Sequence, residues 1–311
     1  MTSGVSNVRP LVEMSATPAA STLHVAALGD SLTTGFSLSS PLTMIWKAHR
    51  HLERSWFVDT SGAIESFVKR LGRHAAVVSH QYATVSAKVV EGQRGALTDC
   101  LVNARHFSRQ VTQVTRLAQF PNLVLIWIGH NNLDWISHHS GVRVLDTAQT
   151  AHLTREFATS FEQQLTRLVD AAASSGHRVA IVVFALVNFE RFFQARDQAL
   201  AGGDGRTRNY RRLDDGYRYF ASMRPEHRAG MIRLSHAFNA SLQKIVGAVR
   251  REKFAGSKLQ VRYSPALHDA DIGSPSMLRD EDAWHPSARG HELLAHCAYD
   301  AVADLLPWLI V

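Results

Sequence analysis

A serine, an aspartate–histidine pair and an asparagine stand where they could act together in acyl chemistry. Ser31 follows an apolar run, in ALGDSLTTG (27–35), and Asn131 follows another such run. Asp282 and His285 are three residues apart near the other end of the chain. A serine hydroxyl is a weak nucleophile, and it needs a histidine base whose tautomer a carboxylate fixes. An asparagine amide can donate a hydrogen bond to the oxyanion that forms.

Each of these residues also has a plain structural interpretation. Ser31 could cap a helix, because serine is a favoured N-cap residue. Asp282 and His285 could be a capping pair or a surface salt bridge, and Asn131 an ordinary turn residue. Their joint order along the chain, with Ser31 and Asn131 at the ends of apolar runs, favours the catalytic interpretation of all four together.

The elements that position these residues follow an alternating pattern of strands and helices. Helical periodicity marks residues 104–119, 149–173 and 231–250. The apolar, β-branched runs are LHVAAL (23–28), AAVVSHQYATVS (75–86), LVLIWI (123–128), RVAIVVFALV (178–187) and LQVRYS (259–264). Such alternation predicts a doubly wound parallel sheet. The chemistry of such folds lies at the carboxyl ends of the strands.

A further helix pattern begins near Ser287 and runs toward the end of the chain, and proline fits its first turn at Pro286. Asp282 and His285 therefore lie on a loop immediately before the terminal helix. Gly129 ends the run before Asn131, where it permits a sharp turn or a close backbone approach.

These blocks together resemble the SGNH (GDSL) hydrolase family. Block one is GDSL (29–32), block three is GHNN (129–132) in place of Gly-x-Asn-Asp, and block five is DAWH (282–285). The pair AALGDSLTTG and DAWHPSARGH is most similar to the phospholipase B-like branch. The resemblance spans nearly the whole chain. It implies a three-layer α/β/α fold of flavodoxin-like type with a five-stranded parallel sheet, and it implies ester hydrolysis.

The resemblance also implies the roles of individual residues. Ser31 would be the nucleophile, His285 the base and Asp282 the residue that orients it. The oxyanion would be held by the Ser31 backbone N–H, by a block-two backbone N–H and by the Asn131 side chain.

Block two departs from the family pattern, which places a glycine there. The matching stretch is YATVSAKVVEG (82–92), and an ungapped match puts Ser86 on the glycine. A one-residue shift puts Ala87 there, and Gly92 and Gly95 are later alternatives. If the position requires a positive φ, a side chain is strained there. We favour Ser86.

The composition is that of a globular protein, with 45% hydrophobic and 20% charged residues among 311. No apolar run is long enough to span a bilayer. The net charge of +7 weakly favours anionic partners. The absence of zinc-finger spacing and of glycine–aromatic motifs argues against nucleic acid. Two cysteines do not make a disulfide framework.

We expect a polar, disordered leader over residues 1–22 and one domain over 23–311. Because the leader lacks a signal-peptide pattern, we expect a cytoplasmic protein, with export as the alternative. An insertion of about 188–228 is rich in glycine, arginine and tyrosine. One interpretation of this insertion is a solvated, partly helical excursion. The other is a clamp over the site, in which Arg208, Arg211 and Arg212 bind an anionic head group. A clamp of this kind could also contact a membrane surface.

No metal or cofactor is expected. HELLAH (291–296) differs from a His-Glu-x-x-His zinc motif, because histidines five residues apart lie about 140° apart around a helix.

The sequence thus predicts a serine esterase that hydrolyses carboxylic esters, with a lysophospholipid or a short or medium acyl ester as substrate. One alternative is a sugar or small-molecule O-deacetylase, and another is an acyltransferase. A third is a catalytically weakened SGNH domain that serves as a binding module, which the changes in blocks two and three would suggest.

Overall fold

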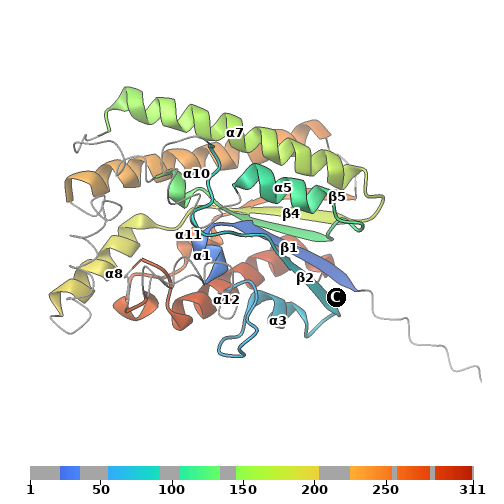
Figure 1. Ribbon diagram of the computed structural model, residues 1–311, viewed down its shortest axis with the longest axis horizontal. Helices are drawn as coiled ribbons and strands as arrows, with labels where there is room; N and C mark the ends of the chain where they lie inside the picture. Colours follow the sequence, from blue (N-terminus) through green and yellow to red (C-terminus); the bar gives the residue numbers. More distant parts are fainter. Residues whose placement is uncertain are drawn as a thin grey trace, which may run out of the picture.

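The structure is a computed structural model, and Figure 1 shows its arrangement. It describes residues 22–35, 55–91, 106–133, 145–202, 225–253, 258–280 and 284–309, with only the backbone at 225–227 and 250–253. Residues 1–21 of the predicted leader lie outside the described part, as do Asp282, Arg208, Arg211 and Arg212.

Five parallel strands form the single sheet of the described residues, in the order β2-β1-β3-β4-β5. The strands are β1 (Leu23–Gly29), β2 (Val77–Gln81), β3 (Leu123–Trp127), β4 (Val179–Phe184) and β5 (Leu259–Ser264). Four lie within a predicted run and β1 extends one residue beyond its run, to Gly29, so the predicted parallel α/β sheet is confirmed. β3 and β4 are buried along their whole length, as strands covered on both faces require.

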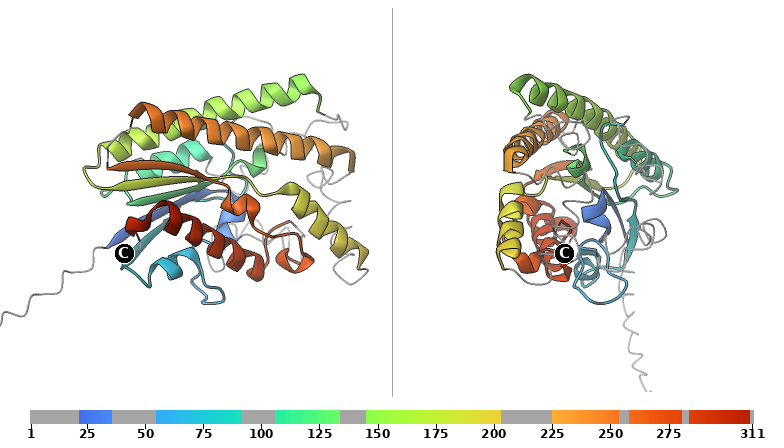
Figure 2. Two further views of the ribbon diagram at one scale, coloured as in Figure 1. Left: turned by 180° about the vertical axis from the view of Figure 1, so that it is seen from behind. Right: turned by 60° about the vertical axis from the view of Figure 1, so that its left-hand side comes forward.

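Helices cover both faces of the sheet and make three layers (Figures 1 and 2). One face carries α5 (Phe107–Thr115), α7 (Thr147–Ala173) and α10 (Pro225–Lys253). The other carries α3 (Phe67–Leu71) and α12 (Ala288–Leu305). The predicted helices 104–119, 149–173 and 231–250 correspond to α5, α7 and α10, the last of which begins earlier than predicted.

Local sequence explains where two of these helices begin. Asp146 and Gln149 form a capping box at the start of α7. The Ser287 hydroxyl accepts a hydrogen bond from the Gly290 N–H at the start of α12. Because Ser287 is the cap, Pro286 precedes the helix, and the expectation that it lies in the first turn is wrong.

The predicted insertion begins with regular structure. Helix α8 (Phe189–Ala201) follows β4, and the last predicted residues, 225–228, belong to α10. Residues 203–224 lie outside the described part. Short helices complete the description: α1 (Ser31–Thr34), η2 (His130–Asn132), α11 (Ala266–Asp269), η4 (Pro275–Met277) and η5 (Pro307–Leu309).

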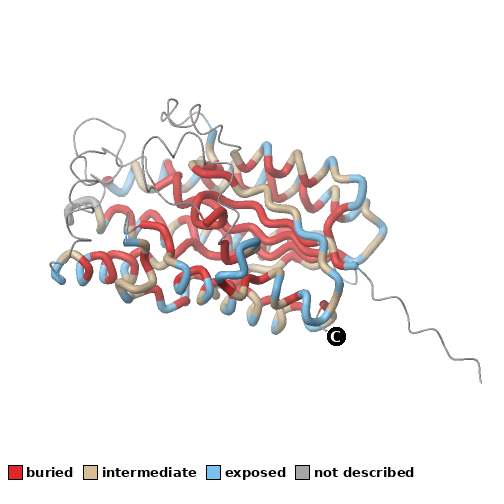
Figure 3. The backbone as a smooth tube through the Cα atoms, turned by 60° about the horizontal axis from the view of Figure 1, so that its bottom comes forward, coloured by how far each residue is buried: buried red, intermediate tan, exposed pale blue. Residues whose placement is uncertain are grey.

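The core is a continuous set of buried side chains around the sheet. Figure 3 shows the central strands buried throughout, while the helices alternate between buried and exposed residues. In this core the fully buried Trp56 makes edge contacts with Trp127 and Phe184, at 6.0 Å between ring centroids in both cases. No helix among the described residues has the length and apolarity needed to cross a membrane.

Candidate active site

Ser31 is the first residue of α1, directly beyond the carboxyl end of β1. The turn requires a glycine at position 29, because a Cβ there would lie 2.3 Å from Thr33 Oγ1 and 2.8 Å from the Trp127 carbonyl oxygen. The Gln110 side chain on α5 accepts from the Gly29 N–H and donates to its carbonyl, both at 2.8 Å. These contacts fix the strand end from which Ser31 projects.

The residue that caps α1 is Asp30, whose carboxylate accepts from the Leu32 N–H at 3.1 Å. The interpretation of Ser31 as the N-cap is therefore wrong. Asp30 is fully buried, and Ser31 retains 6% of its surface exposure. The serine hydroxyl thus stands next to the cap without serving as the cap.

Asn131 lies in η2, just beyond β3, and its side chain connects this turn to block two. Gly129 precedes it with a φ of 128°, and a Cβ there would lie 2.9 Å from the Phe157 ring. The Asn131 amide nitrogen donates to the Ala87 carbonyl at 3.0 Å. Asn132 accepts from the Val89 N–H at 2.8 Å.

Block two forms a turn after β2, and Ser86 occupies its left-handed position. Its φ is 61°, the only positive value at a non-glycine residue in the described part of the chain. The neighbouring Ala87 N–H donates to the Thr84 carbonyl at 3.1 Å, and the Thr84 N–H donates to Gly29. Because the Ala87 N–H is already engaged, the turn favours Ser86 over Ala87 as an oxyanion donor. Gly92 and Gly95 lie outside the described residues.

His285 lies on the predicted loop before α12 and is 3% exposed, which argues against a surface salt bridge. Its carbonyl accepts from the Arg279 N–H at 2.9 Å, and Leu278 and Pro286 form an antiparallel bridge beside it. Arg279 and His285, which flank the segment that contains Asp282, therefore lie next to each other.

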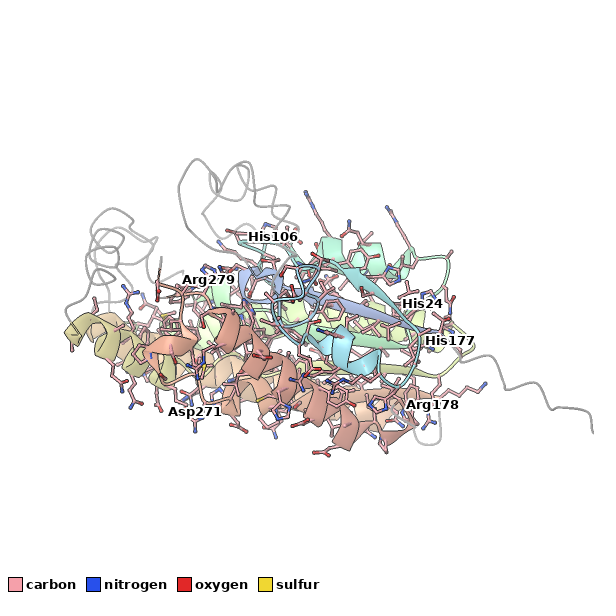
Figure 4. All side chains as sticks on the ribbon, turned by 90° about the horizontal axis from the view of Figure 1, so that it is seen from below. His24, His106, His177, Arg178, Asp271 and Arg279 are labelled. Carbon is pink, nitrogen blue, oxygen red and sulfur yellow. The ribbon has the colours of Figure 1, made fainter. Side chains whose placement is uncertain are left out.

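Arg279 connects this loop to the serine helix. Its guanidinium donates to the Pro286 carbonyl at 3.0 Å through Nε and to the Gly35 carbonyl at 2.8 Å through Nη2. Gly35 is the C-cap of α1. Figure 4 shows Arg279 away from His24, His177 and Arg178, which mark the amino ends of β1 and β4.

A second connection between α1 and α12 involves residues to which the sequence analysis gave no role in the site. The Ser55 hydroxyl donates to the Thr33 carbonyl at 2.5 Å, and the Trp56 N–H donates to His291 Nδ1 at 3.3 Å. Burial lowers the pKa of His291 well below its ordinary value, and Arg279 and His285 lower it further. His291 is therefore neutral at physiological pH.

His291 is also the first histidine of HELLAH, whose other histidine, His296, has a side chain that is 56% exposed and pairs with Asp300. The two histidines therefore face different surroundings. No group of three or more histidine, cysteine or acidic side chains among the described residues is arranged to hold a metal ion.

A small apolar cavity lies between the serine helix and the His285 loop. It has a volume of about 10 Å³, close to the room needed by a single water. Leu32, Trp284 and Pro286 bring residues adjacent to Ser31 and His285 to its wall, and α8 contributes Phe189 and Phe192. The rings of Phe192 and Trp284 meet edge to face at 4.8 Å.

The structure thus gathers the described candidate residues at one edge of the sheet. Ser31, Ser86 and Asn131 follow β1, β2 and β3, which are neighbours in the sheet. The order β2-β1-β3-β4-β5 is that of the flavodoxin-like doubly wound fold, in which ligands bind beyond the carboxyl ends of the strands. Fold and site together are those of an α/β enzyme.

Residues 25–298 match the model of the GDSL-like lipase/acylhydrolase family, so the chain belongs to this family. It is a carboxylic ester hydrolase. No curated protein matches the chain.

Several solved structures resemble it. An extracellular lipase from Streptomyces rimosus shares 17% identity at a TM-score of 0.47, covering 90% of this chain and 99% of that one. The lipase Lip_vut3 from a goat rumen metagenome shares 14% at 0.44, covering 90% and 97%. A carbohydrate esterase of family 3 from Talaromyces cellulolyticus shares 13% at 0.41, covering 92% and 98%. Likenesses of this size do not bear on the substrate.

Proposed function

We propose that the protein is a serine esterase in which Ser31 is the nucleophile and His285 the general base. Asp282 orients the imidazole. The oxyanion receives hydrogen bonds from the Ser31 N–H, the Ser86 N–H and the Asn131 side chain. The observation that best supports this assignment is the pair of connections to the serine helix, from the His285 loop through Arg279 and from the following helix α12 through Ser55–Trp56.

The proposed reaction has two steps. His285 takes the proton of the Ser31 hydroxyl as the oxygen attacks the ester carbonyl, and the protonated histidine then gives that proton to the departing alcohol. The acyl group remains on Ser31 until water, deprotonated by His285, attacks the same carbonyl. As the second oxyanion breaks down, the protonated His285 returns its proton to the departing Ser31 oxygen, which releases the carboxylic acid and restores the serine.

The substrate proposal rests on the surroundings of the two residues. Aromatic and aliphatic side chains line the cavity beside them and suit the acyl portion of an ester. We further propose that the substrate is a lysophospholipid, whose anionic head group Arg208, Arg211 and Arg212 would bind, or a short or medium acyl ester. This substrate class corresponds to the phospholipase B-like branch.

The size of the cavity favours a second candidate, an O-deacetylase for a sugar or small molecule. A volume of about 10 Å³ leaves little room for an acyl chain beyond the carbonyl. An acetyl group needs the smallest displacement of the surrounding side chains. The two candidates differ in the acyl length at which kcat/KM is highest.

The test is hydrolysis of p-nitrophenyl esters of increasing acyl length by the wild type and by Ser31→Ala and His285→Ala. We expect turnover by the wild type and loss to background in both variants. Ser61→Ala and His296→Ala are matched controls on exposed residues and should retain activity. An optimum at acetate would favour the deacetylase, and turnover that survives in Ser31→Ala would refute the proposal.

A further inference from the structure

A second aspartate–histidine pair lies within the site, and the proposed reaction does not use it. His130 Nδ1 lies 2.8 Å from Asp30 Oδ2, and the two residues are 100 positions apart in the sequence. Asp30 is fully buried and His130 is 2% exposed. Asp30 directly precedes Ser31, and His130 directly precedes Asn131.

The hydrogen bonds define the tautomer of His130. The Val187 N–H donates to Nε2 at 3.3 Å, so Nε2 is an acceptor without a proton. The ring proton therefore lies on Nδ1 and is donated to the Asp30 carboxylate. Because both ring nitrogens are engaged inside the protein, His130 has no free nitrogen with which to act as a base toward Ser31.

Both oxygens of Asp30 are engaged as well. Oδ1 accepts from the Leu32 N–H and caps α1, while Oδ2 accepts from His130. A buried carboxylate oxygen without a hydrogen-bond partner costs free energy, so removal of His130 would force the carboxylate to turn toward another donor. That turn would disturb the cap on which the position of Ser31 depends.

We propose that His130 is a positioning residue that sets the Asn131 oxyanion donor in register with the Ser31 nucleophile. His130 directly precedes the donor Asn131, and its ring connects Asp30, the residue before the nucleophile, to the backbone N–H of Val187 just beyond β4. This inference rests on the proposed function, because it assigns His130 a role through Ser31 and Asn131.

Two variants separate this role from general packing. His130→Leu keeps a similar volume but removes both hydrogen bonds, whereas His130→Asn keeps an N–H close to the position of Nδ1. A misplacement of about 1 Å near reacting groups can cost about 100-fold in rate. We expect His130→Leu to lower kcat by roughly 10- to 100-fold with KM little changed, and His130→Asn to restore most of the loss. His268→Asn is the control, because His268 bonds the Leu186 carbonyl at 2.9 Å without connecting the site turns.

Asp30→Ser supplies a second test, and it applies even where His130→Leu does not fold. Serine is also a good N-cap, so the helix keeps its cap while His130 loses its acceptor. We expect kcat to fall in Asp30→Ser as in His130→Leu, and the double variant to be no slower than the slower single variant. Independent losses that multiply, or an unchanged kcat in a folded His130→Leu or Asp30→Ser protein, would overturn the inference.

The proposed function fails in a different way. In that case Ser31→Ala retains the activity of the wild type, or the wild type has none on any ester. If Ser31→Ala is inactive while both His130→Leu and Asp30→Ser match the wild type, only the positioning role is refuted.

Discussion

At the residue scale, Ser86 holds a backbone conformation that suits glycine. A left-handed φ costs a residue with a Cβ about 1–2 kcal/mol, and Ser86 has a φ of 61°. The resemblance places a glycine at this position, so the strained geometry agrees with the ungapped match of block two. The chain keeps the turn and tolerates the strain.

We predict that Ser86→Gly raises the free energy of unfolding by about 0.5–1 kcal/mol, the strain relieved less the added freedom of the unfolded chain. Urea unfolding measures the change, and activity should persist because the backbone N–H remains. Ser79→Gly is the control, since Ser79 lies in β2 at an ordinary φ and should lose stability. A less stable Ser86→Gly protein would contradict this prediction and show that the serine side chain stabilises the fold by more than the backbone strain costs.

The buried His291 should make the free energy of unfolding depend on pH. Its pKa in the folded protein is well below the ordinary value, chiefly because of burial. Below about pH 6.5 the unfolded chain binds a proton at this residue that the folded chain does not. The free energy of unfolding should therefore be highest above about pH 6.5 and fall as the pH drops toward the folded-state pKa.

Urea unfolding between pH 7.5 and pH 5 measures this effect in the wild type and in His291→Gln. The variant should be less stable at neutral pH and should lose part of the acid sensitivity. His296→Gln, at an exposed position, should leave the pH dependence as it is in the wild type. If the stability of His291→Gln and of the wild type fell equally with pH, groups other than His291 would be responsible for the acid sensitivity.

At the element scale, α8 and the His285 loop control the size of the apolar cavity. Phe189 and Phe192 come from the helix and Trp284 from the loop, and their rings contact one another. α8 begins where the chain leaves β4, capped by the Asn188 side chain. Trp284, which directly precedes the proposed base His285, thus packs against α8, the helix that lines the proposed acyl-binding cavity.

We predict that Phe192→Ala moves the chain-length optimum of ester hydrolysis toward longer acyl groups, because it enlarges the cavity next to Trp284. The variant should also lose about 3–5 kcal/mol of stability. Phe161→Ala is the matched control, since Phe161 packs on Phe107 and Phe157, among helices α5 and α7. It should lose comparable stability and keep the wild-type optimum. An unchanged chain-length optimum in Phe192→Ala would show that this cavity is not part of the acyl-binding site.

At the scale of the whole molecule, the sheet order brings distant blocks of sequence together. The strands were predictable because their apolar, β-branched runs report local burial on both faces. The serine, the histidine and the asparagine were found because each stands at the end of such a run or before the last helix.

The contacts that join these blocks could not be found in this way. The Asp30–His130 bond spans 100 positions and the Trp56–His291 bond spans 235. Neither pair has a local spacing that marks it. A buried histidine and an exposed one, such as His291 and His296, look alike in the sequence, and only the packing of α12 distinguishes them.

The most direct test of the account is covalent labelling with a serine-reactive fluorophosphonate, followed by mass spectrometry of the modified peptide. The account predicts a single adduct on Ser31 in the wild type and strongly slowed labelling in His285→Ala, because the base that activates the hydroxyl is gone. An adduct on another serine, or undiminished labelling of the Ser31→Ala protein, would contradict it.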